Sequence, residues 1–423
     1  MRALLALVGL VTLSAAYAQT GNVIFIHPDG TGVNTWGAGR MLMAGPDGML
    51  NWDRLERVGI YRGHLLNSLT ASSNGGGTAH AYGVKVTTGA MGRDRGRQVM
   101  SASGKPHSLM IEALRAGLAG GVISSASVTD AGTGVFLASV DSRRNHEQIA
   151  FQMIASRANV ILGGGEQFFL PAGVRGRHGM GVRTDGVNLI DRARRAGYRV
   201  VFTRDELMRL PAGTTRVLGL FTADDTFNDE PEETLRQENK PLFAPGAPSV
   251  DEMTAAGLRV LQATGRRFFL VAEEEATDNF AGDQNAKGVF EAMRRADRAI
   301  GVALDFQRRN PRTLILTAAD SDCGGMQVLS VDDANAPLPA RDEETGAMLD
   351  GREGTGTLPF LSAPDARGQR FPFAVAWSAG GDLAGGIAAR AHGLNASLLP
   401  AYVQNTDLFR LSYRTLFGRW PGR

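Results

Sequence analysis

Carboxylates gather directly after three short apolar segments that lie far apart in the sequence. They are Asp29 after residues 22–26, Glu273 and Asp278 after residues 267–271, and Asp320 and Asp322 after residues 313–317. One such acid by itself is explained as a helix N-cap or a solvated loop charge. Acids delivered together by three strands would repel one another and raise one another's pKa. The joint pattern therefore predicts a site for divalent cations, while Glu274 and Glu275 are expected to be solvated.

The apolar segments are typical of buried parallel strands, because they are short, rich in β-branched or aromatic residues, and bounded by Gly, Pro or polar residues. They cover residues 22–26, 121–124, 159–162, 199–202, 267–271, 313–317 and 373–377. Apolar residues recur at helical spacing in residues 108–119, 249–264 and 285–309. Strand alternating with helix predicts an α/β fold with a doubly wound, mostly parallel central sheet and helices on both faces. In such a sheet ligands bind beyond the carboxyl ends of the strands, where the acids fall.

The length of 423 residues is compatible with one large domain that carries insertions. We expect residues 19–423 to form this domain, with loop insertions at about residues 205–248 and 331–369, where Pro, Gly and charge are enriched. A content of 43% hydrophobic and 21% charged residues is that of a globular protein. The net charge of +2 and the lack of a basic block argue against nucleic acid as a partner.

The N-terminus has the pattern of a secretory signal peptide. Met1 and Arg2 precede the apolar segment ALLALVGLVTL, and Ala16 and Ala18 are the small residues that a signal peptidase reads. Cleavage after Ala18 is expected, and the apolar core is too short to span a bilayer. The sequence thus predicts an exported protein, periplasmic, cell-envelope or extracellular, with no transmembrane segment.

Cys323 is the only cysteine, so no intramolecular disulfide can form. It lies in the segment DSDCGG, beside acids that would raise its pKa and suppress the thiolate. We therefore expect a structural role for this side chain.

An ordered set of motifs gives the chain a resemblance to a known family. IFIHPDGTG, TGAMG, NVILGGGEQFF, the spacing of Glu273 and Asp278, TAADSD and NTDLF occur in this order over most of the chain. Together they resemble the alkaline phosphatases. The resemblance implies hydrolysis of phosphate monoesters through a phosphoserine intermediate, at a site with two zinc ions, a magnesium ion and a phosphate-binding arginine.

Roles follow from the resemblance for individual residues. It implies that Asp29 bridges the magnesium site and one zinc site and that Glu273 belongs to the magnesium site. It places Asp278 at the leaving-group zinc and Asp320 at the zinc that activates the nucleophile. Arg143 matches the phosphate-binding arginine, a role that suits the planar guanidinium, and Asp130 matches a position behind the magnesium ligands.

Ser73 aligns with the nucleophile of the family. It lies in SLTASSNGGGTAHAYGVK, where a serine at a helix start would meet free backbone N–H groups that favour a phosphoryl oxyanion. Taken alone, the segment is better explained as a surface turn. Ser72 stands where the family has an aspartate, and Ser72 or Thr78 replaces Ser73 as the candidate if the register differs.

The three histidines of the family's zinc sites have no counterparts at the matching positions. Gly282 and Ser321 occupy two of them, and residues 366–368 occupy the expected place of the third. A shell of Asp29, Glu273, Asp278, Asp320 and Asp322 would consist of oxygen only. Such a shell favours magnesium, calcium or manganese over zinc, which remains possible. His27 and His80 lie near the predicted site, and packing or hydrogen-bonding roles are expected for them.

The predicted function is a metal-dependent phosphomonoesterase that acts on a small phosphorylated substrate. A phosphodiesterase on the same fold stays open, because pocket shape decides the substrate. A non-catalytic cell-envelope or surface-layer relative with structural cations stays open too, because fold does not fix function. A homodimer or an association with the cell envelope is compatible with this interpretation.

Overall fold

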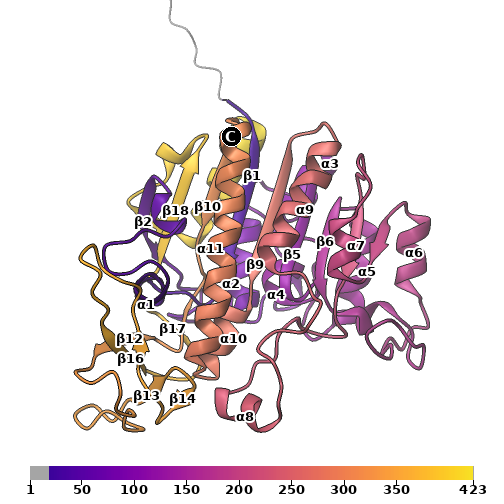
Figure 1. The fold of residues 1–423 in the computed structure, drawn as a ribbon. Coiled ribbons are helices and arrows are strands. Elements are labelled where there is room, and N and C mark those ends of the chain that lie inside the picture. The colour runs from indigo at the N-terminus through magenta and orange to yellow at the C-terminus, as the bar shows by residue number, and fades with distance from the viewer. Residues whose placement is uncertain (1–18, 423) are drawn as a thin grey trace, which may run out of the picture.

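The computed structural model describes residues 19–422, so the predicted signal peptide lies outside the described residues. A ten-stranded sheet, in the order β19-β2-β18-β10-β1-β9-β5-β6-β8-β7, forms the centre (Figure 1). Its strands are β1 (Asn22–Pro28), β2 (Arg57–Arg62), β5 (Ala119–Ser127), β6 (Val160–Gly164), β7 (Arg199–Val201), β8 (Val217–Leu220), β9 (Phe268–Glu274), β10 (Thr313–Thr317), β18 (Ala388–Gly393) and β19 (Tyr402–Gln404). All neighbours from β10 to β7 are parallel, and β18 is antiparallel to β10 and β2. The predicted mostly parallel sheet is confirmed.

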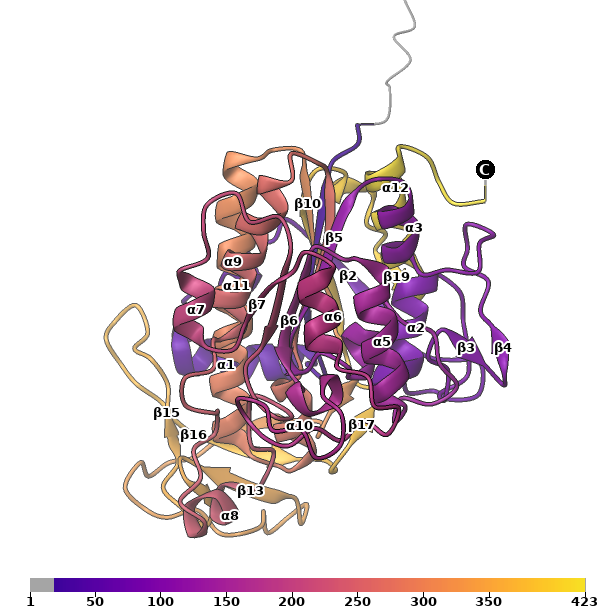
Figure 2. The same ribbon diagram turned by 90° about the vertical axis from the view of Figure 1, so that its right-hand side faces the viewer.

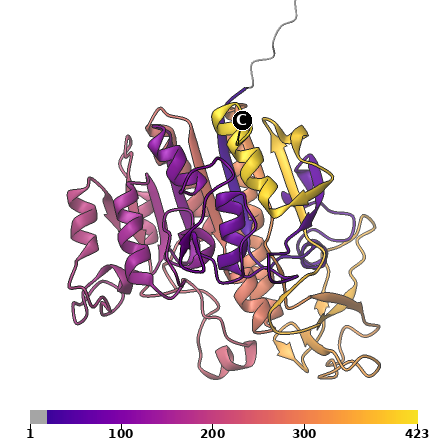
Figure 3. The same ribbon diagram turned by 180° about the vertical axis from the view of Figure 1, so that it is seen from behind.

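Helices cover both faces of this sheet, as Figure 2 shows with the sheet nearly edge-on. One face carries α9 (Val250–Ala263) and α11 (Ala286–Arg309), and the other carries α2 (Ser73–Tyr82), α3 (Leu109–Arg115), α5 (His146–Ser156) and α12 (Asn405–Phe417) (Figure 3). The central strands are apolar along their whole length because each face is buried. In β1, Val23 and Phe25 join one core layer, and Ile24 and Ile26 join the other. The doubly wound arrangement is therefore confirmed.

The sequence signals for the helices hold. Ser249 and Glu252 form the capping box that begins α9. The side chain of Asn285 caps α11 by accepting a hydrogen bond from the N–H of Gly288. α3 begins after Ser108 as expected but ends at Arg115, because Gly117 turns the chain with a φ of +80° into β5.

The strand predicted at residues 373–377 is not part of the central sheet, which corrects that expectation. It is β16 (Pro372–Trp377), which pairs antiparallel with β12 (Gln327–Ser330), β13 (Met348–Gly351) and β15 (Phe360–Leu361), and β14 (Gly354–Thr355) completes this smaller sheet. β16 reads as a core strand because it is central and buried there. The segment at 205–248, expected to be an insertion, contributes β8 to the central sheet.

The remaining elements are short and mostly lie at the sheet edges. They are α1 (Val33–Met43), α4 (Ala131–Gly134), α6 (Leu189–Arg195), α7 (Arg204–Met208), α8 (Glu232–Gln237), α10 (Ala276–Gly282), β3 (Arg93–Asp94), β4 (Arg97–Gln98), β11 (Asp322–Cys323) and β17 (Asp382–Leu383). Among residues 19–422, no helix combines the length and apolar character that crossing a membrane requires.

Candidate functional site

Acidic side chains converge beyond the carboxyl ends of β10, β1 and β9, which are adjacent in the sheet. Three groups of side chains have potential ligand atoms within 4.8 Å of one another. They are His27, Asp29 and Asp320; Asp29, Glu273 and Glu275; and Asp278, Cys323 and Asp382. Asp29 belongs to two groups. Four of the five predicted metal ligands therefore meet here.

The first two groups are buried, and each of their side chains has one polar atom without a hydrogen-bond partner among the described residues. Asp29 and Glu273 are fully buried, and Glu275 is 3% exposed. One oxygen of Asp29, Glu273, Glu275 and Asp320 and the Nε2 of His27 have no hydrogen-bond partner among the described residues. Buried polar atoms are normally paired, because an unpaired one costs about 1–3 kcal/mol. Bound cations would satisfy all of these atoms together.

The pKa values reflect this crowding. Burial, followed by repulsion from Asp29, raises the pKa of Glu273 to about 8, although His27 opposes the shift. Burial and then Asp29 hold the pKa of Asp320 well above its ordinary value. Burial would lower the pKa of His27, but Asp29, with its carboxylate oxygen 3.3 Å from Nε2, acts together with Glu273 and the carbonyl oxygen of Ala318 to raise the pKa to about 9. An excess of negative charge is thus concentrated where cations would neutralise it.

The prediction that Glu274 and Glu275 are solvated is wrong. Both are buried, because β9 continues to Glu274 and α10 follows directly. Glu275 faces the second group, and burial, then Glu273, raises its pKa. Glu274 belongs to none of the three groups, and burial raises its pKa to about 7 against the charge of Arg295.

Helix α2 brings Ser73 to the same place. A Cβ atom added to Gly76 would lie 2.5 Å from the Cβ of Asp320, so this turn of the helix packs directly on the acid. His80, on the same helical face, packs edge-on against His27 with ring centroids 5.4 Å apart. Ser73 precedes them on that face, is 9% exposed, and its hydroxyl makes no hydrogen bond with any described residue.

The two alternative hydroxyls are engaged elsewhere. Ser72 Oγ lies 3.0 Å from the carbonyl oxygen of Thr88 and 3.1 Å from Asn74 Oδ1. Thr78 Oγ1 lies 2.7 Å from the carbonyl oxygen of Asn74 and 2.9 Å from that of Ala90. Both serve the local backbone, which favours Ser73 among the three candidates.

Arg143 lies at the rim of the acidic groups. Its Nη2 donates to Asp130 Oδ1 over 2.7 Å, and its side chain is 38% exposed. Asp130, and after it Glu275 and Asp29, raise the pKa of Arg143, so a cationic group stands beside the cluster. Asp130 precedes α4, in which Gly132 lies so close to Glu273 that a Cβ would overlap Oε1.

The third group contains two residues that the sequence interpretation did not place there. Antiparallel pairing of β11 with β17 sets Cys323 opposite Asp382. The Cys323 thiol lies within 4.8 Å of a carboxylate oxygen of Asp278, and burial, followed by Asp278, raises the pKa of the thiol. Asp382 follows β16 and accepts a hydrogen bond from Ser321 Oγ over 2.6 Å. An acid after an apolar strand was the available signal for Asp382.

Two positions expected to hold histidines adjoin this third group. A Cβ on Gly282 would lie 3.8 Å from Cys323 Sγ, and Ser321 contacts Asp382. The third expected place, residues 366–368, belongs to a loop whose Ala366 N–H donates to Asp47. Asp382, which the sequence did not identify, is the remaining member of this group beside Asp278 and Cys323.

Asp322 does not join the other acids, contrary to expectation. It is buried, but its carboxylate lies against the backbone of Gly32 and Gly385, where an added Cβ would be 2.5 Å from its Cγ in both cases. The reason is the period of a strand: Asp322 begins β11, so its side chain points away from that of Cys323. The potential ligand atoms are therefore not all oxygen, because His27 offers a nitrogen and Cys323 a sulfur.

A small cavity of about 170 Å³ adjoins this site. Asp320 lines it together with Arg62, His64 and residues of the β17 loop.

Comparison with known proteins gives a consistent result. The model of the alkaline phosphatase family matches residues 20–349. Streptomycin-6-phosphate phosphatase of Streptomyces griseus is 29% identical over 82% of this chain and 84% of its own length. Alkaline phosphatase of Escherichia coli is 26% identical over 71% of this chain and 69% of its own. The chain spans only about half the length of alkaline phosphatase 4 of Bacillus subtilis, at 49%.

Solved structures share the fold. Alkaline phosphatase of Thermus thermophilus has a TM-score of 0.73 at 22% identity and covers 98% of this chain and 96% of its own. Alkaline phosphatase from the Antarctic bacterium TAB5 has a TM-score of 0.71 at 19% identity, covering 94% and 98%. A TAB5 mutant has been solved with magnesium bound. Because the family model matches most of the length of this chain, the chain belongs to the alkaline phosphatase family and is a phosphatase-like hydrolase.

Proposed function

We propose that this protein hydrolyses phosphate monoesters through a phosphoserine at Ser73, with divalent cations bound by the three groups of ligands. One observation carries the proposal. Ser73, whose hydroxyl has no partner among the described residues, begins a ten-residue helix that packs on Asp320, and Asp320 belongs to a cluster of buried carboxylates with unpartnered oxygens. A reactive hydroxyl, free helical N–H groups and cation ligands are together what transfer of a phosphoryl group needs.

The three groups suit different cations. Asp29, Glu273 and Glu275 offer oxygen only, which fits magnesium, calcium or manganese. His27 with Asp29 and Asp320, and Cys323 with Asp278 and Asp382, add nitrogen and sulfur, which fit zinc. When bound, such cations lower the pKa of a nearby hydroxyl or water and neutralise negative charge on phosphoryl oxygens.

The side chains of the protein define the reaction. Ser73 Oγ attacks phosphorus in line with the ester oxygen, its proton passes to solvent, and the departing alkoxide is protonated to the alcohol. Arg143 binds the non-bridging phosphoryl oxygens through its two terminal nitrogens. Water then attacks the phosphoserine, which releases inorganic phosphate and restores Ser73. The helix amides of α2 stabilise charge on the phosphoryl group in both steps.

Turnover of p-nitrophenyl phosphate by the purified protein, loaded with zinc and magnesium, tests the proposal. We expect Ser73→Ala to lower kcat by about 10³-fold or more, as loss of a nucleophile does. Ser72→Ala is the matched control, because its hydroxyl is engaged by the carbonyl oxygen of Thr88 and the side chain of Asn74, and it should retain most activity. Acid-quenched protein should carry one phosphoryl group on the peptide containing Ser73.

Other outcomes separate the alternatives. Equal activity of Ser73→Ala and the parent protein would refute the phosphoserine. A higher kcat/KM for bis(p-nitrophenyl) phosphate would make the enzyme a diesterase. Tight cation binding without any turnover would identify a non-catalytic relative, for which an envelope association or homodimer would then be examined by fractionation and light scattering.

We also propose that the chain is exported and that residues 1–18 are removed. The support is the pattern of Arg2, an apolar core and Ala-Tyr-Ala in the sequence. N-terminal sequencing of the protein from a periplasmic or culture fraction should begin at Gln19, and an intact Met1 in the mature protein would contradict the proposal.

A further inference from the structure

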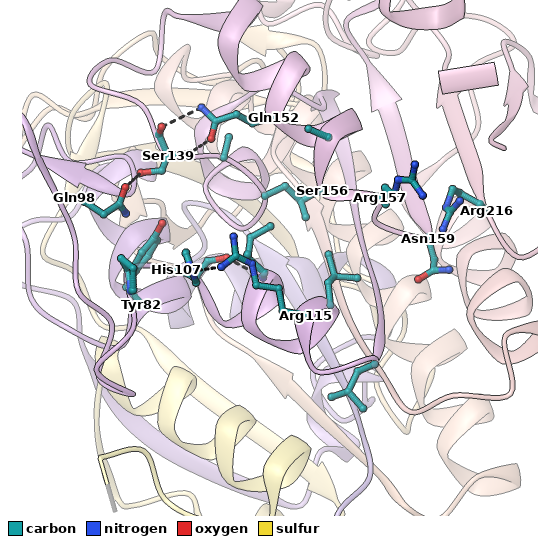
Figure 4. A pocket seen from close by; sticks show the side chains of 18 of the residues that line it. Tyr82, Gln98, His107, Arg115, Ser139, Gln152, Ser156, Arg157, Asn159 and Arg216 are labelled. Atoms are coloured by element: carbon teal, nitrogen blue, oxygen red, sulfur yellow. Dashed lines mark hydrogen bonds between the residues drawn. The ribbon is translucent and has the colours of Figure 1, made fainter. Parts of the chain in front are cut away.

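A large cavity lies at the edge of the central sheet opposite to Ser73. It has a volume of about 660 Å³ and lies at the amino ends of strands, with Leu118 before β5, Asn159 before β6, Arg216 before β8 and Arg266 near the start of β9. α3, the end of α5 and Tyr82 at the end of α2 complete it (Figure 4). We call this cavity the arginine cleft.

The cleft is strongly basic. Four arginines, Arg115, Arg157, Arg216 and Arg266, line it together with His107, and no lining residue is Asp or Glu. Among residues 19–422, none of these arginines forms an ion pair with a carboxylate, unlike Arg40 with Asp53. Unpaired guanidinium groups in a concave surface concentrate positive potential and attract anions.

The contacts of the arginines leave donors available. Arg216 donates from Nη1 to the carbonyl oxygen of Ala196 over 2.9 Å, and its buried Nε has no partner among the described residues. Arg266 makes only a long hydrogen bond of 3.4 Å to Gly117. Arg115 contacts the ring of His107, which carries no negative charge. A bound anion would give these donors the partner that the protein does not provide.

The cleft has two different ends, as Figure 4 shows. Arg157 and Arg216 lie together at one end. At the other end Ser139 hydrogen-bonds to both Gln98 and Gln152, so that end is neutral and already satisfied. His107 and Arg115 lie between the two ends. The lining also includes an apolar wall, formed by side chains such as Ile111, Leu118, Leu137 and Ala155.

We propose that the arginine cleft is a second ligand site, which binds small organic phosphates away from the reactive serine. The phosphate lies at Arg157 and Arg216, and the organic part lies along the apolar wall toward Gln98. A volume of about 660 Å³ is in the range of cavities that hold small molecules of nucleotide size. The proposal does not depend on the chemistry at Ser73.

Isothermal titration of the mature protein with adenosine monophosphate tests this. Ser73→Ala serves as the parent, so that the probe is not consumed, and chelation of cations leaves the acidic site repulsive to anions. Arg157→Asn with Arg216→Gln removes the two charges at the proposed phosphate position, and asparagine tolerates the φ of +57° at position 157. We expect the double variant to bind adenosine monophosphate at least about tenfold more weakly, as losing charge-assisted hydrogen bonds implies.

Matched controls define the outcome. Arg308→Gln with Arg309→Gln removes two charges from the end of α11, outside the lining of the cleft, and should bind like the parent. Adenosine should not bind, and inorganic phosphate should bind more weakly than the nucleotide. Equal affinity of both double variants, or no binding of adenosine monophosphate at millimolar concentration, would overturn the proposal. Circular dichroism confirms that each variant is folded.

Discussion

Gly76 offers the sharpest test of how the proposed nucleophile, Ser73, is positioned. A methyl group at this position would lie 2.5 Å from the Cβ and 2.8 Å from the Cγ of Asp320, and closer still to Oδ2. An ordinary contact is 3.4 Å or more. Gly76→Ala must therefore displace α2 or Asp320 by about 1 Å. A shift of about 1 Å in a catalytic group lowers the rate by about 10²-fold, or about 2.7 kcal/mol in activation free energy.

The neighbouring glycine supplies a matched control. A Cβ on Gly77 would meet its nearest atom, Val135 Cγ1, at 3.2 Å, which a small adjustment relieves. Both substitutions have the same intrinsic benefit for the helix, about 1 kcal/mol for alanine over glycine. Helix propensity therefore does not distinguish the two substitutions, whereas the distance to Asp320 does.

Steady-state kinetics with p-nitrophenyl phosphate at saturating zinc and magnesium measures the difference. We expect kcat of Gly76→Ala, measured on protein shown to be folded, to fall by about 10²-fold, and kcat of Gly77→Ala to fall by less than about threefold. If Gly76→Ala keeps the parent's kcat, α2 does not position the nucleophile against Asp320, and the mechanism is wrong.

Three further predictions concern cations and buried acids. The chelated protein should become less stable as pH rises from about 4.5 to 9. Glu273, whose pKa is raised to about 8, must lose its proton while buried, and His27, whose pKa is raised to about 9, loses the charge that Asp29 stabilises. Divalent cations should abolish this decline in thermal melts, and an equal decline with cations bound would contradict it. Cobalt(II) in place of zinc should give a near-ultraviolet thiolate-to-metal band that is absent in Cys323→Ser, and an unchanged spectrum would exclude the sulfur as a ligand. Burial, then Asp350, raises the pKa of Glu232 to about 8. Glu232→Gln should therefore resist urea better than the parent at pH 8 but not at pH 5. Lower stability of the variant at both pH values would show that the charged form of Glu232 is required.

The strand-end acids show how far local pattern reaches. Apolar runs followed by carboxylates located Asp29, Glu273, Asp278 and Asp320 correctly at one sheet edge, because parallel strands share a direction. The same reasoning failed for Asp322, since the two-residue period of a strand sends adjacent side chains to opposite sides. It failed for Glu275 because the sequence does not reveal that α10 follows β9 without a loop.

Asp382 and Cys323 mark the opposite limit. They are far apart in sequence, and only the antiparallel pairing of β11 with β17 places them side by side near Asp278. β16 likewise has the composition of a central parallel strand, and its partners alone decide that it belongs to the smaller sheet. Composition reports burial and not which strand is adjacent.

By itself, the amino-acid sequence determined the alternation of strand and helix, the doubly wound sheet and the acids at its carboxyl edge, because apolar periodicity and short-range caps are local. The tertiary structure alone decided that Ser73, and neither Ser72 nor Thr78, has a hydroxyl without a partner among the described residues. It also decided that His27 and Cys323 bring nitrogen and sulfur to the acids, and that four arginines with no carboxylate partner among residues 19–422 line a cavity at the far edge. Such facts depend on long-range packing and on which polar atoms remain without a partner after folding, and neither is encoded in any single segment of the chain.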